Sequence, residues 1–322
     1  MTNHLWPQAQ DCLNDDSRRK LRHTLTPFIA PWLERQELPD TFWSVIEAAY
    51  LPLAAYLDDL IARSGCQLLG VAGGQGSGKS TLSGLLIEIL SHGFGRRAVT
   101  FSIDDIYLSH SERQQLARDV HPLLATRGVP GTHDPLLGLY LLQQLKVAGA
   151  GDLVHLPVFD KATDDRLPPE RWRVVEGPFD LIIFEGWCVG AMPQTETDLI
   201  EPINDLERHE DADGLWRRYV NDELTGPYME LFAAVDILLM LKVPGMEQVF
   251  DWRLKQEEQL RAARAGDATA RRVMDAAAIR RFIEHYERLS RHMLEEMPGR
   301  ADIVFALNDQ HMIERIVCHG PV

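Results

Sequence analysis

The sequence has no long hydrophobic run and no paired cysteines, and each absence excludes a class of protein. Its longest apolar runs, such as residues 235–241, fall far short of the roughly 18 residues that cross a bilayer. The first residues show no basic segment followed by an apolar one, which is the pattern of a secretion signal. The four cysteines, Cys12, Cys66, Cys188 and Cys318, form no CxxC pair, so neither a disulfide framework nor a zinc site is indicated. We therefore predict a cytoplasmic protein without a membrane partner.

The chain also lacks an excess of basic residues. Its formal net charge is -15, whereas a general nucleic-acid-binding protein normally presents a basic surface. We predict no nucleic-acid partner and interpret the acidity mainly as a source of solubility. Hydrophobic residues make up 45% and charged residues 25% of the 322 residues, which is typical of a globular protein with one large domain.

Residues 1–65 contain no convincing strand and are predicted to form a helical N-terminal extension. Asp40 can cap a helix in which apolar residues recur at helical spacing from Phe42 to Leu60, as expected for a helix packed on one face. Pro52 is expected to kink this helix. We interpret the extension as structural rather than catalytic.

Five short apolar runs follow the extension, within a predicted domain of residues 66–322. They are continuous rather than alternating, which is typical of strands covered on both faces of a parallel sheet. Helical stretches separate them, so the pattern predicts an α/β fold with a five-stranded parallel sheet flanked by helices. The predicted strands are Gln67–Ala72, Ala98–Ile103, Asp180–Phe184, Asp236–Leu241 and Asp302–Leu307.

The turn after the first predicted strand carries the strongest motif. Residues 73–80 match GxxxxGK[ST] between a strand and a helix, as the motif requires. The glycines allow a tight turn whose N–H groups point at a phosphate, and the helix N-terminus adds a favourable dipole. The motif predicts an enzyme that binds ATP with Mg²⁺, in which Lys79 contacts the β- and γ-phosphates and Ser80 binds the metal ion. The predicted nucleotide-binding residues are Gly73, Gly74, Gln75, Gly76, Ser77, Gly78, Lys79, Ser80 and Thr81.

The second predicted strand ends at a pair of aspartates, followed by Tyr107. Phosphoryl transfer to an alcohol needs a carboxylate that orients the hydroxyl group and accepts its proton. Asp104 leaves the strand at the correct edge of the sheet for that role, and Asp105 and Tyr107 are candidates for contacts with the acceptor. Aspartate pairs also occur in solvated turns and helix caps, and the spacing alone favours neither interpretation.

Glu185 ends the third predicted strand. A carboxylate at this edge can hold Mg²⁺ or its water ligands. The alternative is an acid that pairs with Lys79 at the edge of the core.

Two connections in the predicted domain are unusually long, and long insertions in compact domains usually serve a function. Ligands of open parallel sheets bind beyond the carboxyl ends of the strands. We therefore predict that a segment of about residues 105–178 binds the acceptor. A second segment, of about residues 244–300, is mostly helical and is predicted to be a lid over the nucleotide.

Three stretches in these connections are rich in charged and turn-forming residues. They span residues 127–134, 156–166 and 252–257. An arginine in the last stretch could swing onto the transferring phosphoryl group, because the guanidinium fork matches phosphate oxygens. Each stretch can also be exposed polar surface.

Read together, these stretches resemble the glycerate kinase family of plant and fungal type, within the phosphoribulokinase/uridine kinase superfamily. The matching pieces keep that family's order and cover residues 66 to about 264. They are GGQGSGKST, SIDDIYLS, RGVPGTHD, LPVFDKA, GPFDLIIFEGW and VFDWRLKQEEQLR.

The resemblance implies D-glycerate 3-kinase activity, with ATP as the donor. It implies Asp104 as the general base, Glu185 as the carboxylate beside Mg²⁺ and Arg253 as a cation of the lid. It also implies a group of acceptor-binding residues. These are Arg127, Thr132, His133, Asp134 and Lys161.

Other functions remain open at this stage. One alternative is a related kinase that phosphorylates pantothenate, a nucleoside or a sugar phosphate. Another is a non-catalytic ATP-binding regulatory protein, although binding alone does not need a base such as Asp104.

Overall fold

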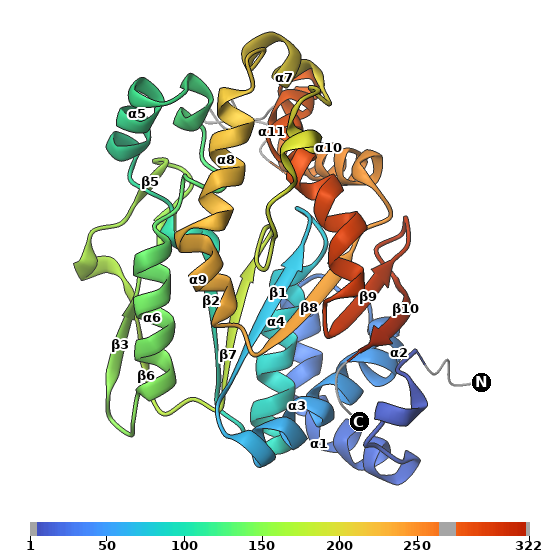
Figure 1. Cartoon of the computed structure of the whole chain (residues 1–322). Coiled ribbons are helices and arrows are strands. Elements are labelled where there is room, and N and C mark those ends of the chain that lie inside the picture. The colour runs from blue at the N-terminus through green and yellow to red at the C-terminus, as the bar shows by residue number, and fades with distance from the viewer. Residues whose placement is uncertain (1–4, 264–274, 320–322) are drawn as a thin grey trace.

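The computed structural model describes residues 5–263 and 275–319. Small parts of the predicted extension, domain and lid (residues 1–4, 264–274 and 320–322) lie outside the described residues. The described part is an α/β fold built on one six-stranded sheet, with helices on both faces (Figure 1). Its strands are β1 (Gln67–Gly73), β2 (Ala98–Ser102), β7 (Leu181–Gly186), β8 (Ile237–Lys242), β9 (Ile303–Leu307) and β10 (Ile313–Cys318).

The strand order is β10-β9-β8-β1-β7-β2. Strands β1, β2, β7, β8 and β9 are parallel, which confirms the five predicted strands, and β10 is added antiparallel to β9 at one edge. The sequence analysis missed β10 because its exposed residues break up the apolar run. Strand β1 lies at the centre of the sheet, so the loop after it opens beside the carboxyl ends of both neighbours.

Three aspartates fix the opposite, amino-terminal edge of the sheet. Each stands just before a strand, and its carboxylate accepts a backbone N–H from an adjacent segment. Asp236 accepts from Leu68 and Asp302 accepts from Leu238, both at 2.8 Å, and Asp180 accepts from the residue before β2. Because a one-residue slip would break these bonds, they help to hold the register of the parallel strands.

Helices cover the two faces of the sheet. The sheet therefore separates two hydrophobic clusters, one on each face. Alternate residues of β1 point to opposite sides, so that Leu69 and Val71 join one cluster and Leu68 and Ala72 join the other. The helices are α1 (Asp15–Arg35), α2 (Trp43–Val45), α3 (Leu51–Ser64), α4 (Lys79–Ile89), α5 (His110–Asp119), α6 (Pro135–Val147), α7 (Asp205–Glu210), α8 (Leu215–Thr225), α9 (Pro227–Ala233), α10 (Met246–Ala263) and α11 (Ala276–Glu296).

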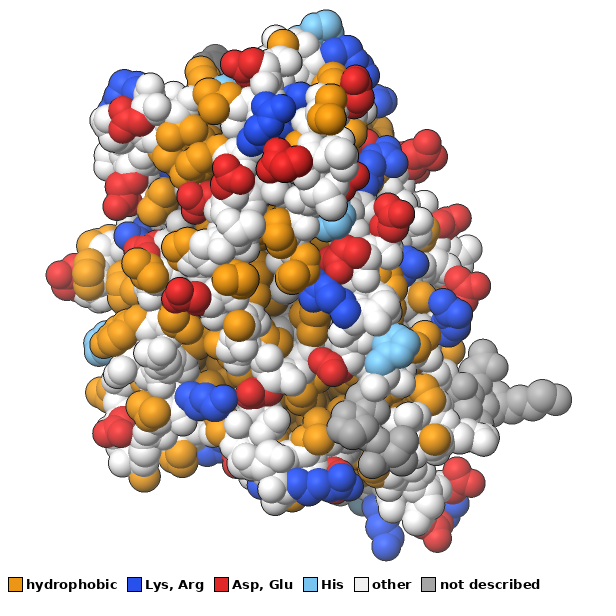
Figure 2. Space-filling model, viewed as in Figure 1, with side chains coloured by type: hydrophobic (Ala, Val, Ile, Leu, Met, Phe, Trp, Pro, Cys, Tyr) orange, Lys and Arg blue, Asp and Glu red, His pale blue; other side chains and the backbone are white. Residues whose placement is uncertain are grey.

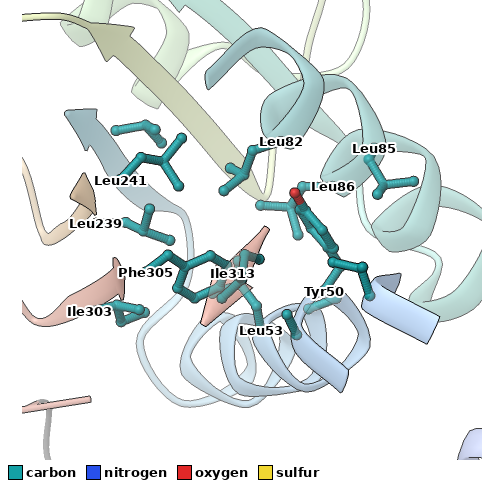
Figure 3. Packing of buried hydrophobic residues seen from close by; sticks show 14 of the residues in the cluster. Tyr50, Leu53, Leu82, Leu85, Leu86, Leu239, Leu241, Ile303, Phe305 and Ile313 are labelled. Carbon is teal, nitrogen blue, oxygen red and sulfur yellow. The ribbon is translucent and has the colours of Figure 1, made fainter. Parts of the chain in front are cut away.

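The N-terminal helices pack directly on the sheet. Tyr50 and Leu53 meet Leu86 of α4 and Phe305 of β9 in the same cluster (Figure 3). Pro52 stands in the first turn of α3, directly after a π-helical segment, Ile46–Tyr50. The predicted helical extension is therefore present, and together with α4 it helps to cover one face of the sheet.

The connection between β2 and β7 forms a separate lobe beside the sheet. It contains α5, α6 and two small antiparallel pairs, whose strands are β3 (Leu153–Leu156) with β6 (Arg173–Glu176) and β4 (Phe159–Asp160) with β5 (Asp165–Arg166). The face formed by α6, α8 and α9 exposes several hydrophobic side chains among charges of both signs (Figure 2). No helix in the described ranges has both the length and the apolar character needed to cross a membrane.

Candidate active site

The loop between β1 and α4 has the backbone of a phosphate-binding loop. Gly76 and Gly78 have φ angles of +77° and +92°, which side-chain-bearing residues rarely adopt. A Cβ atom at Gly73 would lie 2.7 Å from the Ser77 hydroxyl oxygen, so this close turn requires glycine. Helix α4 begins at Lys79, so its first N–H groups open toward the same space.

Lys79 is held at the centre of this loop. Its ammonium group donates to the carbonyl oxygens of Gly73 at 2.8 Å and Gly74 at 3.1 Å. Burial lowers the pKa of Lys79, while the nearby Glu185 and Asp104 carboxylates oppose that effect. A buried cation of this kind is a favourable partner for an anionic phosphate.

Asp104 lies beyond the carboxyl end of β2, in the 3-10 turn Ile103–Ile106 that follows the strand. Its carboxylate accepts a hydrogen bond from Lys161 at 2.7 Å and another from the Tyr107 hydroxyl group at 3.1 Å. Burial acts to raise the pKa of Asp104, but the Lys161 ammonium group outweighs it and holds the pKa below the usual value. The carboxylate is therefore ionised and oriented from two sides.

Asp105 has a different environment. Its carboxylate accepts a long hydrogen bond, 3.4 Å, from the backbone N–H of Phe159. Burial raises the pKa of Asp105 to about 6. The two neighbouring aspartates thus differ in both orientation and acidity.

Glu185 stands next to these groups at the end of β7, where it is paired in register with Ser102 of β2. Burial raises the pKa of Glu185, and the attraction of Lys79 only partly offsets this effect. A cation beside Glu185 would stabilise its ionised form, and a carboxylate with the Ser80 hydroxyl group is an oxygen donor set that suits Mg²⁺. No cluster of three or more acidic, histidine or cysteine ligands occurs among the described residues, so the protein would supply only part of such a coordination shell.

A cleft of about 630 Å³ joins the phosphate-binding loop to these acidic groups. Most of the predicted site residues line it, including Arg127 and Lys161 from the lobe and Arg253 from α10. The predicted residues in its lining are Gln75, Gly76, Gly78, Lys79, Ser80, Thr81, Asp104, Asp105, Tyr107, Arg127, Lys161, Glu185 and Arg253.

Three predicted acceptor-binding residues do not line the cleft. Thr132 is fully buried, and its hydroxyl group makes hydrogen bonds within its own loop. Asp134 caps the N-terminus of α6. His133 stacks behind Tyr107 with ring centroids 4.3 Å apart and contacts the Tyr228 hydroxyl group at 2.7 Å. Burial lowers the pKa of His133 to about 3, so its imidazole is neutral. In this structure these residues support the wall of the cleft.

The structure also brings aromatic residues into the cleft that the sequence analysis did not select. Trp187 donates from its indole to the Gly128 carbonyl at 2.8 Å, and its ring meets that of Tyr286 at 4.9 Å. Trp187 directly follows Glu185 and Gly186 in the sequence, and this position next to a predicted metal-binding residue could have identified it as a site residue. Phe282 and Tyr286 are one turn apart on α11, and nothing local distinguishes them from ordinary core residues.

Helix α10 carries the predicted lid arginine. The guanidinium carbon of Arg253 lies 5.7 Å from the ring centroid of Phe282, so Arg253 reaches the cleft across the contact between α10 and α11. The adjacent Trp252 stacks on His311 at 3.6 Å and donates to the Asp309 carbonyl. These contacts attach the start of α10 to the loop after β9.

Comparison with known proteins gives consistent relatives. No protein-family model matches the chain. The chain is 32% identical over 228 residues to the uncharacterized kinase mug58 of Schizosaccharomyces pombe, which covers 68% of this chain and 78% of that protein. It is 27% identical to the chloroplastic D-glycerate 3-kinase of Arabidopsis thaliana over 79% of this chain and 56% of the plant protein. The solved structure of a D-glycerate 3-kinase from Cryptococcus neoformans matches with a TM-score of 0.69 and 27% identity, covering 84% of this chain and 99% of that one.

Proposed function

The chain belongs to the family of P-loop kinases that includes the D-glycerate 3-kinases, and we propose that it phosphorylates D-glycerate to 3-phosphoglycerate. It is an ATP-dependent kinase that acts on an alcohol. The observation that carries the choice of acceptor is the arrangement of one cleft. Lys79 and the phosphate-binding loop line it, and so does the carboxylate of Asp104 with its cation partner Lys161. An acceptor with both a hydroxyl group and a carboxylate fits that pair.

The residues divide the chemistry between them. The N–H groups of residues 74–80 and the Lys79 ammonium group bind the phosphates and stabilise the charge that develops on them during transfer. Asp104 orients the acceptor hydroxyl group and takes its proton. Ser80 and Glu185 would hold Mg²⁺, which neutralises charge on the β- and γ-phosphates when bound. Trp187, Phe282 and Tyr286 line the cleft with aromatic rings.

The proposal predicts a clear order of acceptors in an ATP-consumption assay. D-glycerate should support the highest kcat/KM, well above pantothenate, uridine and ribulose 5-phosphate. Turnover should stop when Mg²⁺ is removed with a chelator and return when Mg²⁺ is restored. A higher kcat/KM with one of the other acceptors would refute the glycerate assignment and leave the kinase assignment in place.

A second prediction concerns the lid. We expect Arg253→Ala to lower kcat by about 10²-fold or more, because a cation that meets the transferring phosphoryl group stabilises the transition state. The dissociation constant of ATP should change only modestly, since this contact is made when the lid closes. Stopped-flow turnover and equilibrium binding measure the two effects separately.

Arg280→Ala is a matched control for this variant. Arg280 makes the same kind of contact across the α10–α11 interface, 4.9 Å from the ring centroid of Phe250, but does not line the cleft. Its loss should leave kcat near the wild-type value. Weaker ATP binding with an unchanged kcat in Arg253→Ala would make Arg253 a ground-state ligand of the nucleotide.

The cytoplasmic location and the absence of a nucleic-acid partner stay predictions.

A further inference from the structure

The contact between Lys161 and Asp104 places a cation on the group that must accept a proton. The ammonium group donates to the carboxylate at 2.7 Å. A carboxylate paired in this way is a weaker proton acceptor, because the neighbouring positive charge favours its ionised form. The paired state therefore suits the enzyme without an acceptor better than the enzyme during transfer.

Lys161 is well placed to change partners. It lies in the tight loop between β4 and β5, and its side chain is 62% exposed. Exposed ion pairs on long, flexible side chains are weak and exchange easily. Arg127, the other cation of the lobe that lines the cleft, is more constrained: it is paired with Asp164 and lies 5.3 Å from the ring centroid of Phe159. Of these two cations, Lys161 is the one that can move at low cost.

We propose that Lys161 is the specificity-determining residue for hydroxy acids, because the carboxylate of the acceptor replaces Asp104 as its partner. This inference rests on the proposed function. In D-glycerate a single carbon separates the carboxyl carbon from the carbon that bears the transferred hydroxyl group. When that hydroxyl group meets Asp104, the carboxylate is therefore within reach of the ammonium group. A carboxylate-bearing alcohol thus binds and releases the base in one event.

The transfer step then balances without a further reactant. The O–H bond of the acceptor breaks and its proton passes to the released Asp104 carboxylate. The acceptor oxygen forms a bond to the γ-phosphorus, and the bond from that phosphorus to the bridging oxygen breaks, with its electron pair leaving on ADP. A neutral alcohol such as glycerol would have to displace Lys161 from Asp104 without offering it a new partner.

The decisive experiment compares D-glycerate with glycerol, which has the same carbon skeleton with CH₂OH in place of the carboxylate. Lys161→Met keeps the apolar stem and removes the charge. We expect kcat/KM for D-glycerate to fall by about 10²-fold, which is the usual size of the loss when one partner of a close charge pair is removed. We expect kcat/KM for glycerol to rise, because Asp104 is then free from the start. Opposite changes with the two acceptors are the signature of partner exchange.

Lys146→Met is the matched control. Lys146 is also an exposed lysine paired with an aspartate, Asp236, at 3.2 Å, but it lies at the far edge of the sheet. Its kcat/KM values for both acceptors should match the wild type, and circular dichroism should show that both variants are folded.

Three results would overturn the inference. Equal losses with both acceptors would mean that Lys161 acts on the phosphoryl group or on Asp104 regardless of the carboxylate. A normal rate with D-glycerate would mean that Lys161 does not recognise the acid. A loss with D-glycerate and an unchanged rate with glycerol would leave carboxylate binding but refute the release of the base. These results are distinguishable from failure of the proposed function, in which the wild-type enzyme itself would not phosphorylate D-glycerate and both ideas would fall together.

Discussion

Replacement of Lys79 by alanine is expected to abolish phosphoryl transfer and leave the fold intact. Lys79 is the first residue of α4, and the printed bonds of its ammonium group go to carbonyl oxygens of its own loop, so its removal breaks no hydrogen bond to a distant segment of the described structure. During transfer, by contrast, it is the buried cation beside the phosphates. Loss of charge stabilisation of this kind costs about 10³-fold or more in kcat.

A coupled assay for ADP and circular dichroism test the two parts of this prediction. Lys20→Ala, which changes an exposed lysine of α1, serves as the control and should keep wild-type turnover. Near-normal turnover in folded Lys79→Ala would contradict the assignment of residues 73–80 as the nucleotide-binding loop.

Asp104→Asn is expected to lower kcat by about 10² to 10⁴-fold, the usual contribution of a general base. Asparagine keeps the size of the side chain and can still accept from Tyr107, but it cannot take a proton. Asp105→Asn should cost clearly less, because the Asp105 carboxylate faces the backbone N–H of Phe159. The two catalytic rates should be compared at saturating ATP and acceptor, with binding measured separately.

The acidities of the two aspartates make this comparison informative. A base is most effective when its pKa lies near the working pH. The pKa of Asp105 is raised to about 6 by burial, whereas that of Asp104 is lowered, against its burial, by Lys161. If Asp105→Asn proves the more damaging change, Asp105 is the general base and Asp104 is not. The pKa of the carboxyl group, rather than its orientation, then decides which aspartate accepts the proton. The result expected here requires Lys161 to leave Asp104 before transfer.

Some features of this protein follow from the sequence because they depend on neighbouring residues. The phosphate-binding loop needs only its glycines, a strand before it and a helix after it, and all three are contiguous between Gln67 and Ile89. Four of the five parallel strands were recognisable because burial on both faces leaves no polar alternation, whereas the edge strand β2 alternates between buried and half-buried residues. That Asp104 and Glu185 stand at one edge of the sheet follows from the rule that parallel strands end together.

Other features depended on how distant segments meet. The ion pair between Lys161 and Asp104 joins the lobe to the end of β2, and no sequence pattern encodes a 2.7 Å contact between two such segments. Phe282 and Tyr286 reach the cleft only because α11 packs beside the phosphate-binding loop. The family resemblance made residues 132–134 candidates for acceptor contacts, yet none of them lines the cleft, and His133 is packed between Tyr107 and Tyr228.

The sequence by itself thus determined the parallel sheet, the nucleotide-binding loop and the acidic edge, because local backbone preference and burial are written in adjacent residues. The tertiary structure alone decided which cation meets which carboxylate and which side chains face the cleft. It also decided that the N-terminal helices join α4 in covering one face of the sheet. The physical reason is that charge pairing and close packing act between surfaces, and those surfaces exist only after segments far apart in the chain have come together.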